Sequence, residues 1–141
     1  MVPQTTVICA VWHQDAERHQ LLQTHQANLE RQTVPLHRIY VFDNNDTPPA
    51  GLHGTKVVVS ERLSIFQAWN VALSLVATPY VLNLNLDDRL APDALAKLEA
   101  ALQTELRNSL RRVLDIDHRA SRCCGRAIRT GRDERAPVGF P

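Results

Sequence analysis

Apolar residues along this chain alternate between short continuous runs and longer segments with helical spacing. Four short runs contain many β-branched residues, as buried strands do. They cover residues 6–12, 38–42, 56–59 and 80–86. Three longer segments have the polar and apolar composition of surface helices. They cover residues 15–32, residues 64–77 and a segment that starts near residue 92 and runs past residue 104. This alternation predicts an α/β fold, with a mostly parallel sheet flanked by helices.

Start and stop signals support the predicted helices. Asp15 and Ser64 each precede a helical segment, and both residue types are favoured N-caps. Pro35 and Pro79 end the first two helices, because proline cannot continue the backbone hydrogen bonding. Pro92 suits a first helical turn, where its missing N–H would have had no partner.

Polar side chains follow three of the four predicted strands. They are found at Trp12-His13, in the loop 43–45 and in the segment 85–88. Ligands of parallel α/β sheets bind at the carboxyl ends of the strands. We therefore expect these three segments to converge on one binding site.

Asp87 and Asp88 are adjacent carboxylates at the end of a predicted buried strand. Two such groups repel each other and lose solvation there, unless a cation sits between them. Carboxylate and amide oxygens suit Mg²⁺ or Mn²⁺, so with Asn85 they form a candidate metal site. The alternative is that one of the two carboxylates caps the helix that follows.

Asp43 directly follows the second strand, where its carboxylate could accept a hydrogen bond from a base N–H or a ribose hydroxyl. The alternative is a residue that only starts the turn 43–46. Arg62 is a candidate phosphate contact, although a single surface arginine is usually only solvated. Asn70 lies inside a predicted helix, where asparagine is unfavourable, so a hydrogen-bonding role is an open hypothesis.

Composition narrows the class of protein. The formal net charge of +1 gives no reason to expect nucleic acid as a partner. No apolar run reaches the roughly 18 residues of a membrane-spanning helix, and the first residues do not follow the plan of a signal peptide. Three cysteines without a second zinc-binding pair indicate reduced thiols. We therefore expect a cytoplasmic protein with no integral membrane segment.

The last part of the chain differs from the rest in charge and pattern. Residues 1–104 contain 7 basic and 10 acidic residues, a net charge of −3. Residues 105–141 contain 9 arginines and 5 acidic residues, a net charge of +4, and lose any apolar period after Ile116. We expect one domain over 1–104 and a divergent Arg-rich tail over 105–141. Two hypotheses for the tail are that it is disordered and that it results from a shifted reading frame.

Four blocks in the first domain resemble family 2 glycosyltransferases of the GT-A fold. The first strand, 7–13, is similar to the V-I-I-P-V-Y-N that opens such proteins, and 41–47 to V-V-D-D/N-G/N-S-T. The segment 64–72 resembles G-I-S-x-A-R-N-x-G, although Trp69 and Ala72 replace its Arg and its last Gly. The segment 84–95 resembles L-D-A-D-D-x-L-x-P-D-A-L, with Asn85 in place of the first Asp of D-x-D.

The resemblance implies a domain that binds a UDP-sugar with Mg²⁺ or Mn²⁺ and transfers the sugar to an acceptor. It places the uridine contact at Asp43, a supporting contact at Asn70 and the metal at Asp87 and Asp88. The full set of implied nucleotide-binding residues is Ala10, Val11, Trp12, Asp43, Arg62, Asn70, Asn85 and Leu86. Residues beyond about 110 do not resemble the acceptor half of the family, and the catalytic base is unassigned.

Two other functions stay open on the sequence. One is a truncated module that binds UDP without transferring a sugar. The other is a phospho-acceptor domain of the receiver type, in which aspartates also cluster at strand ends. Such a domain needs a lysine after its last strand, and Lys56 and Lys97 are poorly placed for that role.

Overall fold

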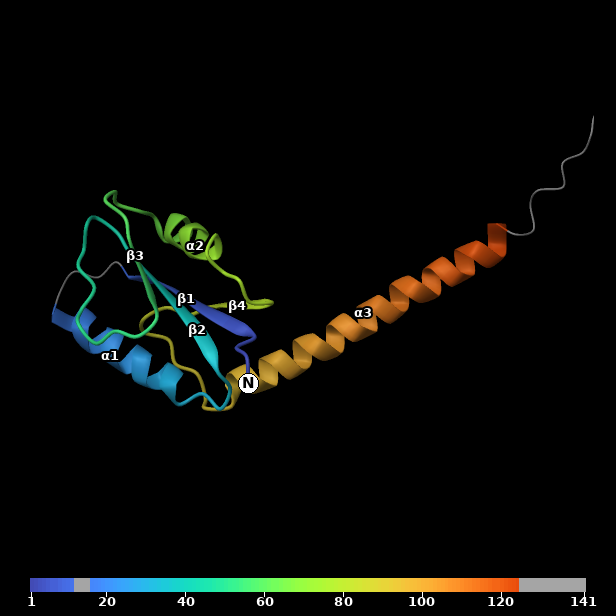
Figure 1. Ribbon diagram of the computed structural model, residues 1–141, viewed down its shortest axis with the longest axis horizontal. Helices are drawn as coiled ribbons and strands as arrows, with labels where there is room; N and C mark the ends of the chain where they lie inside the picture. Colours follow the sequence, from blue (N-terminus) through green and yellow to red (C-terminus); the bar gives the residue numbers. More distant parts are fainter. Residues whose placement is uncertain (12–15, 125–141) are drawn as a thin grey trace, which may run out of the picture. The chain divides into compact units, whose positions relative to one another are not determined.

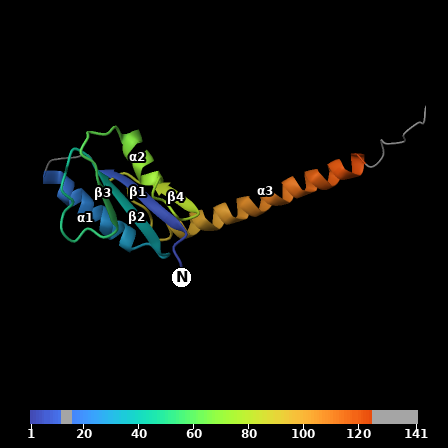
Figure 2. The ribbon, with the colours of Figure 1, turned by 45° about the horizontal axis from the view of Figure 1, so that its top comes forward.

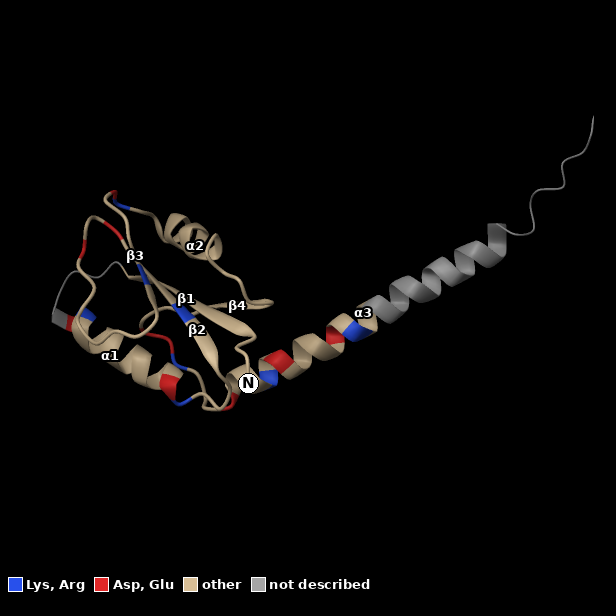
Figure 3. Ribbon diagram, in the orientation of Figure 1, with Lys and Arg blue, Asp and Glu red and all other residues tan. Residues whose placement is uncertain are grey.

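The central strand of the sheet explains most of the architecture. In a computed structural model, which describes residues 1–11 and 16–124, all seven residues of β1 (Thr5–Val11) are buried. The strand contains no charged residue and is drawn entirely in tan in Figure 3. Such a continuous apolar strand is stable only when both of its faces are covered.

Four parallel strands form the sheet, in the order β3-β2-β1-β4. β2 (Leu36–Phe42) pairs with β1 along its whole length, so that Val11 lies opposite Phe42. β3 (Thr55–Val58) and β4 (Tyr80–Asn83) are short strands at the two edges of this sheet. The predicted α/β fold with a parallel sheet flanked by helices is therefore confirmed.

Two helices cover opposite faces of the sheet (Figures 1 and 2). α1 (Ala16–Glu30) packs against one face, where its Leu22 joins a core cluster with Cys9 and Val11. α2 (Ile65–Leu73) covers the other face, where Ala68 and Ala72 pack with Ile8 and Ala10 of β1. Successive side chains of a strand point to opposite faces, so β1 contributes to both halves of the core.

The structure corrects the ends of several predicted elements. α2 ends at Leu73 and not at residue 77: Ser74 is its C-cap, and the next two backbone N–H groups, of Leu75 and Val76, donate three residues back and not four. β4 ends at Asn83 and not at residue 86, because the chain folds into a turn in which Asp88 N–H donates to the Asn85 carbonyl. The predicted cap Ser64 is confirmed, whereas Asp15 lies outside the described residues.

α3 (Ala94–Cys124) is the last described element. The chain divides into two units after Leu102, and α3 begins in the first unit and continues in the second. The helical residues therefore include 105–124 of the Arg-rich segment. Within residues 1–11 and 16–124, no helix combines the length and apolar character needed to cross a membrane.

A histidine occupies a core position that the apolar pattern did not predict. The buried side chains of α1 are Leu22, His25 and Leu29, whereas Ala27 is exposed. His25 has no exposed surface, and its Nδ1 is hydrogen-bonded to the Tyr40 hydroxyl at 3.1 Å. Burial, with a smaller effect of the Arg89 guanidinium, lowers the pKa of His25 to about 4.

We expect acid to destabilise this fold through His25. Its pKa is about 4 in the folded chain and 6.5 without the fold, so the unfolded chain binds more protons between these values. The stability that neutral His25 provides is therefore complete above pH 6.5 and is lost as the pH falls to 4, in total about 3 kcal/mol. Urea unfolding across this pH range measures the effect. A His25→Phe variant should show a flatter pH dependence, and an unchanged slope would contradict the assignment.

Candidate functional site

The carboxyl ends of the parallel strands lie at one edge of the sheet. β1 ends at Val11, between the end of β2 and the chain that follows β4. Asp43 comes directly after β2, and the turn 85–88 follows β4 after a backbone hydrogen bond from Leu84 N–H to the Ile8 carbonyl. Two of the three polar segments predicted from the sequence thus lie at this edge. The third, Trp12-His13, lies outside the described residues.

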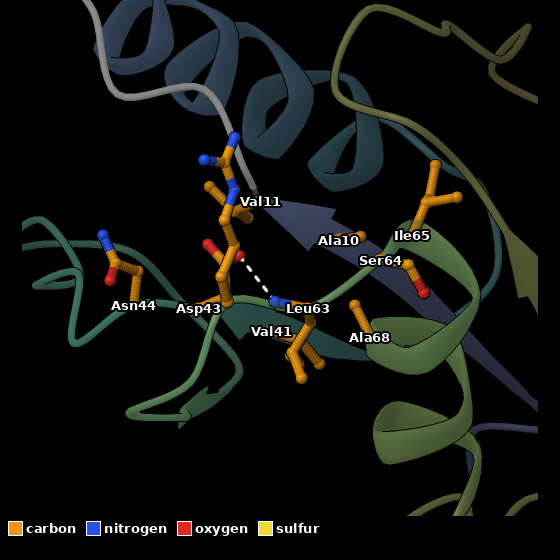
Figure 4. Close-up of a pocket in the computed structure, with 10 residues that line it drawn as sticks. Ala10, Val11, Val41, Asp43, Asn44, Leu63, Ser64, Ile65 and Ala68 are labelled. Carbon is orange, nitrogen blue, oxygen red and sulfur yellow. Dashed lines mark hydrogen bonds between the residues drawn. The ribbon is translucent and has the colours of Figure 1, made fainter.

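A cavity of about 580 Å³ opens between the ends of β1 and β2 and the start of α2 (Figure 4). Its walls are mostly aliphatic, and its polar groups are gathered on the loop after β2 and on the segment that leads into α2. The lining residues are Ala10, Val11, Val41, Asp43, Asn44, Arg62, Leu63, Ser64, Ile65 and Ala68. Apolar walls with few polar groups are typical of small-molecule sites.

Asp43 is the acidic group of this cavity, and its side chain is held in place from one side. The residue is only 7% exposed, and its Oδ2 accepts a hydrogen bond from the Leu63 backbone N–H at 3.0 Å (Figure 4). Among the described residues, Oδ1 has no hydrogen-bond partner. Asp43 therefore has one oxygen used by the fold and one available to accept a hydrogen bond from a ligand.

The loop after Asp43 is fixed by backbone geometry. Asn44 and Asn45 adopt left-handed conformations with φ of 53° and 55°, which asparagine tolerates better than most residues. Their N–H groups donate to the carbonyls of Glu61 and Val59, each at 3.0 Å. These bonds join the loop after β2 to the chain after β3 and hold Asn44 where it lines the cavity.

The start of α2 is fixed by a reciprocal pair of hydrogen bonds. Ser64 Oγ accepts from Gln67 N–H at 3.3 Å, and Gln67 Oε1 accepts from Ser64 N–H at 2.8 Å. This capping box satisfies two backbone donors at the helix end. Ser64 and Ile65 consequently keep a defined position on the rim of the cavity.

The structure brings together some of the predicted site residues. Ala10, Val11, Asp43 and Arg62 all line the cavity. Asn70 does not: it lies on the exposed face of α2, because the buried face of that helix is formed by Ala68 and Ala72. The sequence did not point to Leu63 or Ile65, whose contribution depends on how the loop before α2 folds back over Asp43.

No residue of the turn after β4 lines this cavity. Leu86 is a core residue that packs with Cys9 and Val11. Asp87 and Asp88 are exposed, which corrects the expectation that they lose solvation at the end of a buried strand. β4 is an edge strand with an exposed residue at every second position, so the turn that follows it reaches solvent.

The two carboxylates of this turn have different surroundings. Asp88 Oδ2 accepts the Asn85 N–H at 3.3 Å, so Asp88 closes its own turn and does not cap α3, which starts at Ala94. Asp87 has no hydrogen-bond or ion-pair partner among the described residues. It is the carboxylate of this turn that is available to a ligand.

The described residues fit a divalent cation only if a ligand completes its coordination. Within 1–11 and 16–124, no group of three or more His, Cys, Asp or Glu side chains could hold a metal ion. Mg²⁺ is usually bound by one or two carboxylates together with substrate phosphates and water. The exposed Asp87, with Asn85 nearby in the same turn, fits that kind of shared site.

Comparison with family models finds no match for this chain, and comparison with curated proteins finds no significant one. The fold and the cavity therefore define the class that is shown: an α/β domain with a parallel sheet and a pocket at the carboxyl ends of its strands.

We expect Asp43→Ala to reduce the free energy of unfolding by about 1–3 kcal/mol, because the partly buried Leu63 N–H loses its acceptor. Asp43→Asn retains an acceptor oxygen and should stay within about 1 kcal/mol of the wild type. Urea unfolding at pH 7 measures both. Equal stability of the wild type and the alanine variant would show that the hydrogen bond to Leu63 contributes nothing.

Proposed function

We propose that this chain carries the nucleotide-sugar-binding part of a GT-A-type glycosyltransferase, with the uridine of a UDP-sugar in the cavity beside Asp43. The observation that carries the proposal is the state of the two oxygens of Asp43. Oδ2 accepts a hydrogen bond from the Leu63 N–H, and Oδ1 has no partner among the described residues. A uracil ring has an N–H donor between two carbonyls, and a carboxylate oxygen is a strong acceptor for it.

The shape of the cavity supports a flat base. Val11 and Val41 from the two strands and Ala68 from α2 form apolar walls, against which an aromatic ring can pack. Arg62, an exposed residue on the rim, supplies a positive charge that suits a phosphate. The aliphatic walls and the acceptor together favour a neutral base with an N–H over a charged ligand.

The strand order supports a diphosphate across the end of β1. In the order β3-β2-β1-β4, the direction of strand addition reverses at β1, so β2 and β4 flank it on opposite sides. Ligands of open parallel sheets bind at such a switch point. In this proposal the nucleoside lies on the β2 side, and the diphosphate extends to the turn after β4.

Asp87 would hold a Mg²⁺ or Mn²⁺ ion together with the diphosphate oxygens. A cation there neutralises charge on the leaving diphosphate when the sugar departs. The roles of this chain's own residues are binding roles: Asp43 selects the base, Arg62 attracts phosphate, and Asp87 contributes a cation ligand. Of the other predicted residues, Asn85 lies in the same turn as Asp87 and has an amide oxygen that could assist, whereas Leu86 is buried in the core and Asn70 lies on the exposed face of α2.

A second candidate function is UDP binding without sugar transfer. It is favoured by one observation: the described residues that follow the turn after β4 form only α3, with no further strand. The two candidates differ in one readout. Both require UDP binding, whereas only the enzyme consumes a UDP-sugar in the presence of an acceptor or water.

We expect the purified chain to bind UDP in calorimetric titration, with an affinity that Mn²⁺ increases. Asp87→Ala should remove most of that increase and leave the affinity without Mn²⁺ within about twofold, because Asp87 contacts only the cation. Asp93→Asn, which removes a half-exposed charge paired with Lys97, is the matched control and should behave as the wild type. Absence of UDP binding by the folded wild-type chain would contradict the proposed function.

Asp43→Asn tests how the base is selected. Its amide oxygen can keep the Leu63 N–H, which turns the NH₂ group toward the cavity, where a uracil N–H needs an acceptor. We expect UDP affinity to fall about tenfold or more, and the ratio of CDP to UDP affinity to rise, because cytosine offers an acceptor at that position. An unchanged preference between UDP and CDP would place the base elsewhere.

A further inference from the structure

A row of polar side chains on α1 faces the chain that follows β4. Thr24, Asn28 and Gln32 are spaced four residues apart, which puts them on one face of the helix and its C-terminal extension. Each of them forms hydrogen bonds with residues between 89 and 95. These bonds join two segments that are more than fifty residues apart in sequence, and we refer to the three residues as the polar row of α1.

Asn28 lies in the middle of this row, and its side-chain amide both donates to and accepts from the backbone of Leu90. Its Nδ2 donates to the Leu90 carbonyl at 2.9 Å, and its Oδ1 accepts the Leu90 N–H at 2.9 Å. The side-chain amide of Asn28 thus satisfies both the N–H and the carbonyl of Leu90, as a neighbouring strand would do in a sheet. Gln32 continues the same pattern, with Nε2 donating to the Ala91 carbonyl at 2.9 Å and Oε1 accepting the Leu95 N–H at 3.3 Å.

Arg89 connects the polar row to the turn that contains the two aspartates. Its Nη1 donates to the carbonyls of Leu86 and Asp88, both at 2.6 Å, and its Nη2 donates to Thr24 Oγ1 at 2.6 Å. One guanidinium therefore contacts the carbonyls on both sides of Asp87 and a helix side chain at once. A planar group with several fixed donors is suited to such a bridge, whereas a lysine ammonium is a single point of attachment.

The consequence is a turn whose backbone is fixed and whose Asp87 side chain is not used. Leu86 is buried on one side of Asp87, and Asp88 is bonded back to Asn85 on the other. The guanidinium of Arg89 lies against α1, where it donates to Thr24. Asp87 is exposed and keeps its carboxylate for a ligand.

We infer that Arg89, together with Asn28 of the polar row, is a positioning residue for Asp87: it holds the turn 85–88 in the conformation that binds the cation. The inference rests on the proposed function, because it assigns these residues to the cation part of that site. Neither residue lines the cavity beside Asp43, so neither is needed for contact with the base.

The first experiment measures the turn without any ligand, by amide hydrogen exchange in the full chain. Arg89→Ala should raise the exchange rate at the Asp88 N–H at least tenfold, and Asn28→Ala should do the same at the Leu90 N–H, which loses its acceptor. Arg38→Ala is the matched control, because it also removes one arginine, whose guanidinium pairs only with Glu30 among the described residues. If the exchange rate at the Asp88 N–H is the same in Arg89→Ala as in the wild type, the inference is overturned.

The second experiment measures UDP affinity of the same variants with and without Mn²⁺. Arg89→Ala should reduce the Mn²⁺-dependent gain in affinity about tenfold and leave the affinity without Mn²⁺ within twofold, while Arg89→Lys recovers part of the gain. A role limited to general stability would lower both affinities together, and that result would overturn the inference. Arg38→Ala should match the wild type in both conditions.

The outcomes separate this inference from the proposed function. A wild-type chain that binds no UDP contradicts the proposed function, and the positioning role falls with it. A wild-type chain that binds UDP with a Mn²⁺-dependent gain, which Arg89→Ala retains in full, overturns the positioning role alone.

Discussion

Burial of β1 on both faces is the constraint on which this structure depends. The strand lies between β2 and β4 in the sheet and between α1 and α2 across it, so its residues belong to every core cluster. Only an uncharged sequence can occupy that position. Burying an unpaired polar side chain there would cost roughly 2–7 kcal/mol, and burying an unpaired charge would cost more. Any ligand must therefore approach the strand at its end.

The candidate site follows from where the burial stops. Polar residues begin immediately after the last paired residue of β2, and Asp43 is the first of them. Phe42 before it is fully buried, Asp43 itself is only 7% exposed, and its carboxylate is held by the Leu63 N–H. The turn after β4 is different. It follows an edge strand and exposes Asp87 and Asp88 to solvent, and it is held by the buried Leu86 together with the hydrogen bonds of Arg89 and Asn28.

These two kinds of fixation suit two kinds of interaction. A buried, half-satisfied carboxylate in an aliphatic pocket discriminates between ligands by hydrogen bonding, because an unmatched group would stay unpaired there. An exposed carboxylate on a turn with a fixed backbone discriminates little between ligands by itself, but it can bind a cation together with oxygens of the ligand. The proposed nucleotide-sugar site combines both, with the base beside Asp43 and the diphosphate near Asp87.

The sequence by itself determined the class of fold, because the alternation of short apolar runs and helical segments leaves few ways to bury them. It also determined that Asp43 directly follows a strand and that Ser64 caps α2, since these are local relations, whereas the strand before Asp87 ends at Asn83 and not at residue 86. Only the tertiary structure decided which residues meet. Asn70 lies on the exposed face of α2, away from the cavity. The Leu63 N–H donates to Asp43, and His25 is buried in the core with a hydrogen bond to Tyr40. Each of these depends on the packing of segments far apart in the chain, which a local pattern does not contain.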